Sequence, residues 1–199
     1  MSWRSGGGSS GRLFVVSGPS GAGKGTVVRG VLAQRPDVFL SVSATTRPAR
    51  QGERNGADYH FIPEAEFLGM RDRGEFLESA EVYGNYYGTP RAPVEAALSI
   101  GKDVLCELDI QGAQAIKRAE PHAILVFIEP PSLDHLEVRL RGRGTEDRDT
   151  LAERLRAAYD EVKVKGTYDH IVVNDEVERA VEELLRIMNG SHTSKGTPR

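Results

Sequence analysis

Short runs of apolar residues alternate with segments of helical spacing along most of the chain. Leu13–Val16 is wholly apolar and ends at a turn that begins with Ser17. Beyond the next glycines, the apolar spacing predicts a helix; its residues are Val27, Val28, Val31 and Leu32. Further apolar runs occupy 104–106, 124–128 and 171–173, each followed by a helical pattern. Wholly apolar strands are typical of a parallel sheet covered on both faces, so the alternation predicts an α/β fold with a parallel sheet flanked by helices.

Two stretches interrupt this alternation. Residues 41–90 contain short mixed segments, which predict a small, largely extended lobe around one short helix near 64–73. Residues 139–150 are charged and punctuated by glycines, and Thr150 with Glu153 has the spacing of a capping box that opens the next helix. A mobile flap and a solvated connection between helices both fit this second stretch.

The length and the ends of the chain indicate one domain. The 199 residues suit a single compact unit with insertions. Residues 1–11 and 190–199 are rich in Gly, Ser and Thr, so we interpret both as flexible tails. The domain is therefore expected over residues 12–189.

The composition of the chain argues against several classes of binding partner. A net charge of −3 gives no general attraction to nucleic acid or to an anionic membrane, and no apolar run reaches the roughly 18–20 residues of a membrane span. The single cysteine, Cys106, excludes an internal disulfide and a cysteine zinc cluster, and favours a reducing compartment. We expect a cytoplasmic protein without a nucleic-acid, membrane or obligatory protein partner.

A glycine-rich segment follows the first apolar strand and opens the first helix. Its residues are Gly18, Pro19, Ser20, Gly21, Ala22, Gly23, Lys24, Gly25 and Thr26. In this context the pattern indicates a P-loop, whose backbone N–H groups cradle nucleotide phosphates while Lys24 adds a cation. Gly25 stands where the strict pattern has the hydroxyl residue that binds Mg²⁺, and Thr26 comes one place later, which weakens the metal assignment more than the phosphate assignment. A glycine-rich turn with an incidental lysine is the alternative.

Two arginines three residues apart suggest an acceptor for a second phosphate. Arg47 and Arg50 flank Pro48, and two guanidinium forks in one turn suit a phosphate dianion. Tyr59 and Tyr87 could add hydroxyl donors. Taken alone, the arginines would also fit a solvated surface turn.

Several longer motifs together resemble those of guanylate kinases. They are Gly-Pro-Ser-Gly-Ala-Gly-Lys, Ser-Val-Ser-Ala-Thr-Thr-Arg, Gly-Ala-Asp-Tyr-His-Phe, Gly-Asn-Tyr-Tyr-Gly-Thr, Asp-Ile-Gln-Gly-Ala, Gly-Arg-Gly-Thr-Glu and Val-Val-Asn-Asp. They occur in the family's order over about residues 12–189. The resemblance implies a P-loop NTPase core, an inserted small mixed GMP-binding lobe at about 41–90 and a short lid at about 139–154.

The resemblance also implies which residues bind GMP. By this resemblance, the phosphate is bound by Arg47, Arg50, Tyr59 and Tyr87. Guanine is bound by Ser43, Glu78 and Thr89. Glu78 makes chemical sense, because guanine presents its N1–H and 2-amino donors side by side and one carboxylate can accept both. Adenine would leave that carboxylate without partners. Without the resemblance, Glu78 would be interpreted as an exposed strand residue.

Two acidic residues follow the apolar run 104–106. Glu107 and Asp109 are two residues apart, and residues at that spacing on a strand point to the same face of the sheet. We therefore expect both side chains at the strand end where such sheets bind ligands. The resemblance implies that they contribute to the GMP site and, with Thr26, to Mg²⁺ binding directly or through water. Simple solvation of a strand end is the alternative.

The remaining residues implied by the resemblance concern the lid and the donor base. Arg139, Arg143 and Arg154 correspond to arginines that close over the transferring phosphoryl group, and Asn174 and Asp175 to residues that contact the adenine of ATP. An Asn-Asp pair after a strand is also an ordinary turn signal.

The resemblance implies phosphorylation of GMP, and of dGMP, by ATP with Mg²⁺ to give the diphosphate in purine nucleotide metabolism. Lys24, Arg47 and the three lid arginines would be catalytic through charge stabilisation and positioning, without a general base. The alternative is a guanylate-kinase-like scaffold that binds phosphorylated partners and lacks catalysis. The P-loop lysine and the lid arginines argue against that alternative.

Overall fold

The computed structural model describes residues 11–190 except 83, 133, 138–155, 157 and 158. The chain forms two compact units: Met1–Ser17 with Pro36–Leu125, and Gly18–Arg35 with Val126–Arg199. The predicted lid, with Arg139, Arg143 and Arg154, lies outside the described residues, as does the predicted capping box.

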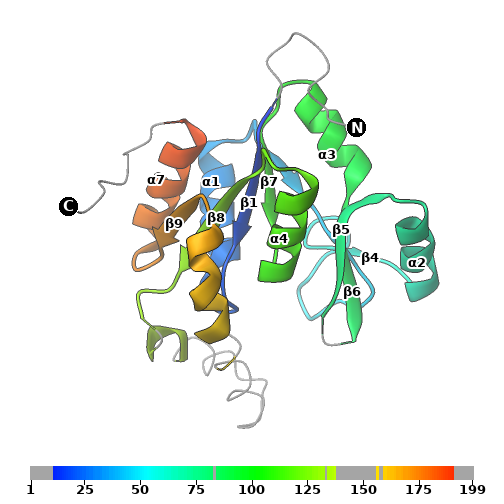
Figure 1. The fold of residues 1–199 in the computed structure, drawn as a ribbon, viewed down its shortest axis with the longest axis horizontal. Helices are drawn as coiled ribbons and strands as arrows, with labels where there is room; N and C mark the ends of the chain where they lie inside the picture. The colour runs from blue at the N-terminus through cyan, green and yellow to red at the C-terminus, as the bar shows by residue number, and fades with distance from the viewer. Residues whose placement is uncertain (1–10, 83, 133, 138–155, 157–158, 191–199) are drawn as a thin grey trace. The chain divides into compact units, whose positions relative to one another are not determined.

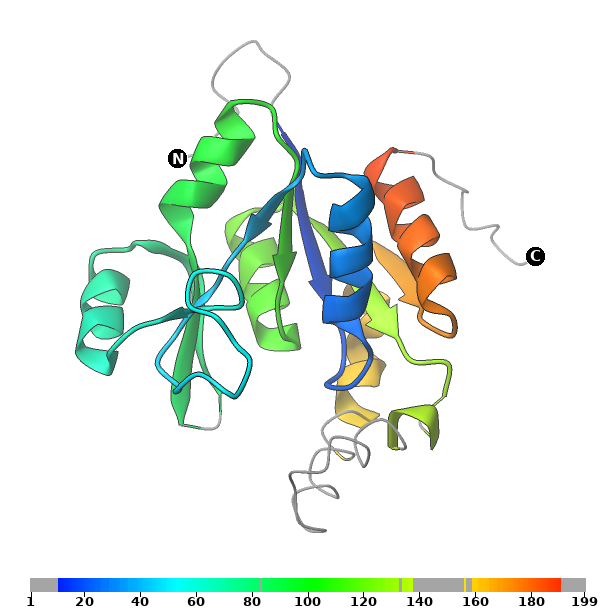
Figure 2. The same cartoon turned by 180° about the vertical axis from the view of Figure 1, so that it is seen from behind.

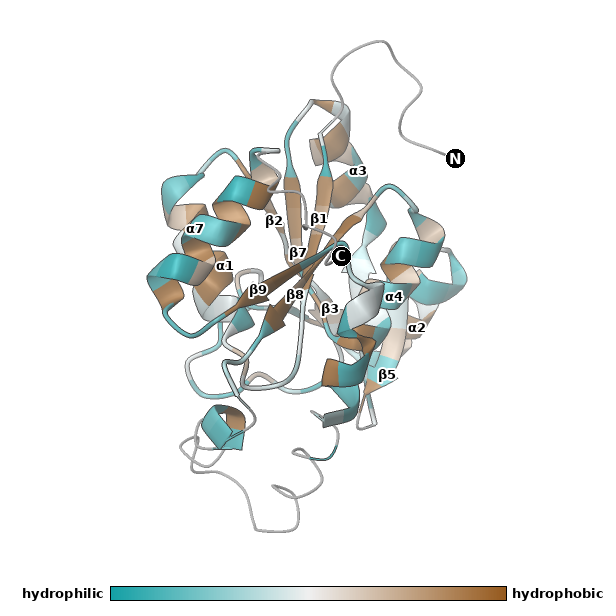
Figure 3. Ribbon diagram, turned by 60° about the vertical axis from the view of Figure 1, so that its left-hand side comes forward, coloured by the Kyte–Doolittle hydropathy of each residue, from teal (hydrophilic) through white to brown (hydrophobic). Residues whose placement is uncertain are grey.

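Three parallel strands form the first sheet of the first unit, in the order β2-β7-β1. They are β1 (Leu13–Ser17), β2 (Phe39–Ser41) and β7 (Val104–Glu107). Every residue of β1 is buried, and the strand is coloured as hydrophobic in Figure 3. Helices α3 (Arg91–Ser99) and α4 (Ile110–Ala119) pack against these strands. Strands buried on both faces explain the wholly apolar run.

The first unit also contains a smaller mixed sheet, in the order β4-β3-β6-β5. Its strands are β3 (Ala44–Thr45), β4 (His60–Phe61), β5 (Phe76–Val82) and β6 (Asn85–Pro90). Strands β3 and β4 are parallel, whereas β6 is antiparallel to both β3 and β5. Helix α2 (Glu64–Asp72) lies against β5 (Figures 1 and 2). The short helix and the extended segments predicted within 41–90 are therefore present.

The core of this smaller sheet is aromatic. Phe67 of α2 is fully buried, and its ring stacks on Phe76 at 4.5 Å and on Tyr86 at 5.5 Å between ring centroids. Gly88 lies beside them, where an added Cβ would be 2.9 Å from the Phe76 ring. The absence of a side chain at Gly88 lets the rings approach the strand.

The second unit combines parallel strands with helices. Strand β8 (Ile124–Glu129), which begins in the first unit, pairs in parallel with β9 (His170–Val173). Helix α1 (Lys24–Gln34) packs on α7 (Val177–Met188), and the 3₁₀ helix η1 (Val164–Thr167) precedes β9. Residues 134–137 and 159–163 are also helical. The α/β class and the parallel strands predicted from the apolar runs are confirmed.

Within the part of the chain that the structure describes, no helix has both the length and the apolar character that crossing a bilayer requires.

We expect Phe67→Ala to lower the free energy of unfolding by about 3–5 kcal/mol, because it leaves a cavity among stacked rings. Urea unfolding followed by circular dichroism measures this change. Ile100→Ala is the control, because Ile100 is 72% exposed and its truncation should change the free energy by less than about 1 kcal/mol. Equal effects of the two substitutions would show that Phe67 does not anchor the small sheet.

Candidate active site

The glycine-rich loop connects β1 to α1 through backbone conformations that favour glycine. Gly18, Gly21 and Gly23 have φ angles of 143°, 86° and 89°, in the region that side chains other than hydrogen disfavour. A Cβ at Gly18 would lie 2.3 Å from the carbonyl oxygen of Ile128. Gly23 is the N-cap of α1, so the loop ends at the N-terminus of that helix, where N–H groups and the helix dipole favour anions.

Lys24 is the first residue of α1, and its ammonium turns back onto the loop. Its Nζ donates to the carbonyl oxygens of Gly18 at 2.7 Å and Pro19 at 3.2 Å. These bonds hold the cation beside the loop that the sequence predicts for phosphates. Ser20 and Thr26 are exposed, and the Thr26 hydroxyl accepts a hydrogen bond from Arg29.

Asn174 contacts the same loop through its side chain. It follows β9, is 2% exposed, and its side-chain amide donates to the carbonyl oxygen of Ala22 at 2.7 Å. The structure therefore gives Asn174 a contact with the phosphate loop itself, and its contact with adenine stays a prediction. Asp175, the next residue, is exposed and pairs with Arg179 at 2.9 Å.

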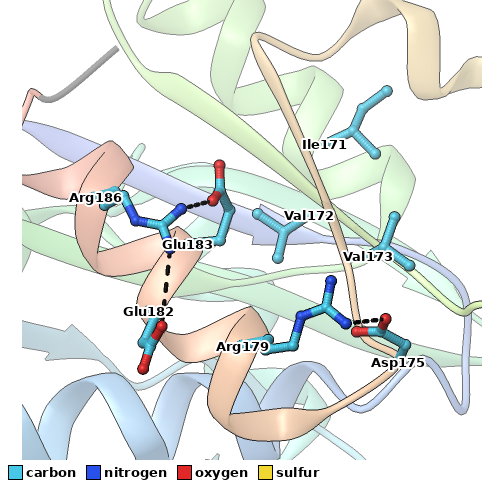
Figure 4. A pocket seen from close by; sticks show the side chains of 8 residues that line it. All are labelled: Ile171, Val172, Val173, Asp175, Arg179, Glu182, Glu183 and Arg186. Carbon is cyan, nitrogen blue, oxygen red and sulfur yellow. Dashed lines mark hydrogen bonds and ion pairs between the residues drawn. The ribbon is translucent and has the colours of Figure 1, made fainter. Parts of the chain in front are cut away.

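A pocket of about 360 Å³ lies between β9 and α7. Figure 4 shows its lining: Ile171, Val172, Val173 and Asp175 on one side, and Arg179, Glu182, Glu183 and Arg186 on the other. The arginine heads are directed at carboxylates within the pocket, Arg179 at Asp175 and Arg186 at Glu182 and Glu183. Because these charges pair with one another, the pocket offers little to a polyphosphate.

In the first unit, Arg47 lies just beyond β3 and is only 8% exposed. Its Nη1 and Nη2 donate to the two carboxylate oxygens of Glu53, each at 2.7 Å, and Nη1 also donates to the carbonyl oxygen of Pro48 at 2.9 Å. The pair raises the pKa of Arg47 above its ordinary value and lowers the pKa of Glu53 to about 2. Both groups are therefore charged at neutral pH.

Aromatic rings surround the Arg47 guanidinium. It lies 5.0 Å from the centroid of the Tyr59 ring and 5.6 Å from that of Phe61, within the range of cation–π attraction. Tyr59 meets Tyr87 edge to face at 6.0 Å, and Tyr87 also interacts with Arg47. Burial raises the pKa of Tyr59, so its hydroxyl keeps its proton and can donate. The structure thus brings together three of the four residues predicted for the acceptor phosphate.

The fourth, Arg50, is exposed, and its backbone N–H donates to Glu53 at 2.8 Å. Ser43, predicted at guanine, is partly buried between β2 and β3, and its carbonyl oxygen accepts the His60 N–H.

Glu78 and Thr89 are opposite each other on β5 and β6. The Thr89 hydroxyl donates to Glu78 Oε1 at 2.7 Å, with Thr89 fully buried and Glu78 8% exposed. Burial raises the pKa of Glu78 to about 7, aided by the charge of Asp109 and opposed by the Thr89 hydroxyl. Glu78 is therefore buried, which corrects the alternative of an exposed strand residue.

The position of Asp109 corrects a second expectation, that Glu107 and Asp109 lie on one strand and share a face. Strand β7 ends at Glu107, which is exposed, and Asp109 is the N-cap of α4, where its Oδ1 accepts the Gly112 N–H at 2.7 Å. The rule that alternate strand residues share a face does not apply, because the strand has ended. A Cβ at Gly112 would lie 3.2 Å from both Asp109 Oδ1 and Glu78 Oε2, so the glycine makes room for the two carboxylates.

Oxygen ligands suit Mg²⁺, and the residues predicted for the metal offer only oxygen: the Thr26 hydroxyl and the carboxylates of Glu107 and Asp109. Asp109 already uses one oxygen as the cap of α4. Across the described residues, acidic, histidine and cysteine side chains form no group of three that could hold a metal by itself. The donor set fits an ion that keeps most of its ligands from nucleotide phosphates and water.

Two residues of this region escaped the sequence analysis. Glu53 carries the ion pair with Arg47, and Gly112 provides the space beside Glu78. A carboxylate three residues after Arg50, within the same turn, was the available signal for Glu53. For Gly112 the only signal was its place in the Asp-Ile-Gln-Gly-Ala motif.

Comparison with known proteins identifies the family. The family model of guanylate kinase matches residues 10–191. The chain belongs to the guanylate kinase family. Among curated relatives, the guanylate kinase of Dechloromonas aromatica is 48% identical over 189 residues, which is 95% of this chain and 94% of the relative. That of Aromatoleum aromaticum is 47% identical over 181 residues, covering 91% and 89% of the two chains.

A solved structure supports the same conclusion about fold. The crystal structure of guanylate kinase from Anaplasma phagocytophilum matches with a TM-score of 0.76 and 33% identity, over 94% of this chain and 89% of that one. The predicted resemblance to guanylate kinases and the P-loop kinase fold are therefore confirmed.

We expect Glu78→Gln to stabilise the protein increasingly as pH rises. The carboxyl pKa is raised from 4.5 to about 7 by folding, so the stability that its protonated form contributes is complete below pH 4.5 and is lost as pH rises through about 7. A glutamine does not titrate. Between pH 5 and pH 8 the variant should gain about 2–3 kcal/mol over the parent protein.

Denaturant unfolding at both pH values measures this gain. Glu81→Gln on the same strand is the control, because Glu81 is exposed and its substitution should give no comparable pH-dependent gain. A constant difference between Glu78→Gln and the parent would contradict a raised pKa at Glu78.

Proposed function

We propose that this chain transfers the γ-phosphoryl group of ATP to GMP, giving ADP and GDP. The observation that carries the proposal, besides family membership, is the buried carboxylate of Glu78. It accepts hydrogen bonds from the hydroxyl and the backbone N–H of Thr89, and within the described part of the chain it forms no ion pair. A buried carboxylate without a cation is costly unless a ligand supplies donors.

Guanine supplies the donors that Glu78 lacks. Its N1–H and 2-amino groups can donate side by side to the two oxygens of one carboxylate, with Thr89 and Ser43 adding hydroxyls and Asp109 a second carboxylate. Adenine has an acceptor at N1 and no 2-amino group, so it would leave Glu78 unpaired. Because these residues are assigned to the base, we propose that dGMP is accepted as well.

The Arg47 cluster is proposed to bind the phosphate of GMP. Arg47 and Arg50 would provide charge-assisted hydrogen bonds, and the hydroxyls of Tyr59 and Tyr87 neutral ones. The contact between the Tyr59 and Tyr87 rings and the cation–π contact with Arg47 support a shared ligand for these groups. The Tyr59 hydroxyl remains protonated at neutral pH and therefore acts as a donor.

ATP is proposed to bind at the loop that ends at Lys24. The N–H groups of the loop and of the first turn of α1 would hold the phosphates, and the Lys24 ammonium would sit beside the β and γ groups. Asn174 would keep the loop in shape through Ala22. Asp175 is proposed near adenine.

The transfer breaks the bond between the γ-phosphorus and the oxygen that bridges to the β-phosphate, and forms a bond from a GMP phosphate oxygen to the γ-phosphorus. The attacking oxygen is ionised near neutral pH, so no residue has to remove a proton. Charge stabilisation and positioning then account for catalysis, and we assign them to Lys24, Arg47, Arg50 and the lid arginines 139, 143 and 154.

Mg²⁺ is proposed to accompany ATP, with Thr26, Glu107 and Asp109 as direct or water-mediated ligands. When bound, the ion neutralises charge on the phosphates. The cytoplasm is the proposed location, because it supplies both nucleotides and keeps the buried thiol of Cys106 reduced.

The experiment that tests this function is release of ADP from MgATP with GMP, AMP, CMP and UMP offered separately to the same folded preparation. We expect rapid release with GMP alone. Equal release with AMP would contradict the role of Glu78, and no release with any acceptor would contradict the proposed reaction.

We expect Glu78→Gln to reduce the preference for GMP over IMP, which lacks the 2-amino group. A glutamine offers one acceptor oxygen and turns an NH₂ donor toward the donors of guanine. The loss in the ratio of kcat/KM values should be about 10–100-fold, the scale of a charged hydrogen bond. Steady-state kinetics with both acceptors at saturating ATP measure it, with Glu81→Gln as control. An unchanged ratio would remove Glu78 from the base site.

A further inference from the structure

We infer that Glu53 is a positioning residue for the acceptor phosphate, because one carboxylate holds both the guanidinium of Arg47 and the backbone of Arg50. The inference rests on the proposed function, since it concerns the phosphate end of the same acceptor site. Glu53 is not expected to touch the substrate and acts through the two arginines.

The N–H donors of the Arg47 guanidinium form two sets: those that bond to Glu53 and Pro48, and those on the edge formed by Nε and Nη2. Glu53 takes one hydrogen from Nη1 and one from Nη2, and the carbonyl oxygen of Pro48 takes the other hydrogen of Nη1. A guanidinium has five N–H donors in a fixed plane. The Nε–H and the second Nη2 hydrogen form a separate fork that neither Glu53 nor Pro48 occupies, and the side chain of Tyr87, also proposed for the phosphate, hydrogen-bonds to the same guanidinium. Glu53 therefore does not occupy the edge that a phosphate would use.

Glu53 also explains how a nearly buried guanidinium stays in one orientation. Arg47 is 8% exposed and is flanked by the rings of Tyr59 and Phe61. A buried cation requires a partner, and a bidentate carboxylate supplies both the compensating charge and a fixed plane. With the plane fixed, the edge of Arg47 formed by Nε and Nη2, which Glu53 does not occupy, points in one direction.

The same carboxylate couples the two arginines across Pro48. Its Oε2 accepts from Arg47 Nη1 at 2.7 Å and from the Arg50 backbone N–H at 2.8 Å. The turn that carries Arg50 is therefore tied to the guanidinium of Arg47. Losing the carboxylate would release both cations at once.

The balance of charge around Arg47 favours a role for Glu53 in positioning the arginines rather than in increasing their attraction for phosphate. Arg47 and Arg50 are opposed by Glu53 and by Glu107, whose charge acts on Tyr59 in the same cluster. A site that bound phosphate by attraction alone would omit Glu53. The alternative is that Glu53 competes with the phosphate for Arg47, and it predicts the opposite effect of removing the carboxylate.

The test compares binding of GMP and of guanosine, which lacks the phosphate, by calorimetry in the parent protein, Glu53→Gln and Glu53→Asp. We expect Glu53→Gln to weaken GMP binding about tenfold or more and to change guanosine binding less than about twofold, because misdirected arginines affect only the phosphate. Glu53→Asp, which keeps the charge, should recover part of the loss. In kinetics, the KM for GMP should rise more than the KM for ATP.

Asp103→Asn is the matched control. Asp103 holds Arg12 in the same way, accepting from its backbone N–H and from two side-chain nitrogens, away from the residues proposed for either substrate. This variant should leave the ratio of GMP to guanosine affinity unchanged.

Three outcomes would overturn the inference. Unchanged or tighter GMP binding by Glu53→Gln, while the parent protein binds GMP, removes the positioning role and leaves the proposed function intact. Equal weakening of GMP and guanosine shows a general structural role instead. Failure of the parent protein to bind GMP overturns the proposed function together with the inference.

Discussion

Removing a charge from water requires compensation, and the first unit buries two charges that are compensated in different ways. Arg47 finds its counter-charge within the chain, in the carboxylate of Glu53. Glu78 has a hydroxyl from Thr89 and the unfavourable charge of Asp109 nearby, so its pKa rises to about 7. In the proposed function the phosphate end of the acceptor site is therefore built before the ligand arrives, whereas the guanine end is completed by the ligand.

The strand and helix framework makes this burial feasible. Pairing of β5 with β6 sets Glu78 opposite Thr89, and the end of β7 brings Asp109 to the N-terminus of α4. Gly112, in the first turn of that helix, leaves room for both carboxylates. A helix N-terminus also lowers the cost of negative charge. Several modest contributions thus reduce the cost of burying the Glu78 carboxylate, which in the proposed function selects guanine.

The phosphate loop of the second unit follows another constraint, that of backbone conformation. Gly18 approaches the Ile128 carbonyl so closely that no side chain fits, and two further glycines have positive φ. Lys24, at the end of the loop, donates to the carbonyl oxygen of Gly18, and the Asn174 amide donates to that of Ala22. A loop held in this way can present its N–H groups to phosphates without first reorganising, which is the preorganisation that phosphoryl transfer requires.

The sequence alone determined the features that depend on neighbouring residues. The apolar runs specified β1, β7, β8 and β9, the glycine spacing specified the loop and the start of α1, and the ordered motifs identified the family. Each of these signals is local, because a few consecutive residues are enough to indicate a buried strand, a helical spacing or a turn that requires glycine.

Only the tertiary structure decided which distant groups meet. Asn174 reaches Ala22 across 152 positions of sequence, and Glu78 becomes buried because β6 and α4 cover it. Asp109 caps a helix because β7 ends at Glu107, two residues before it, whereas the sequence analysis treated both residues as part of one strand. Even the nearby pair of Arg47 and Glu53 depended on the turn between them. Side-chain partners and burial follow the path of the whole chain, and a local pattern cannot specify that path.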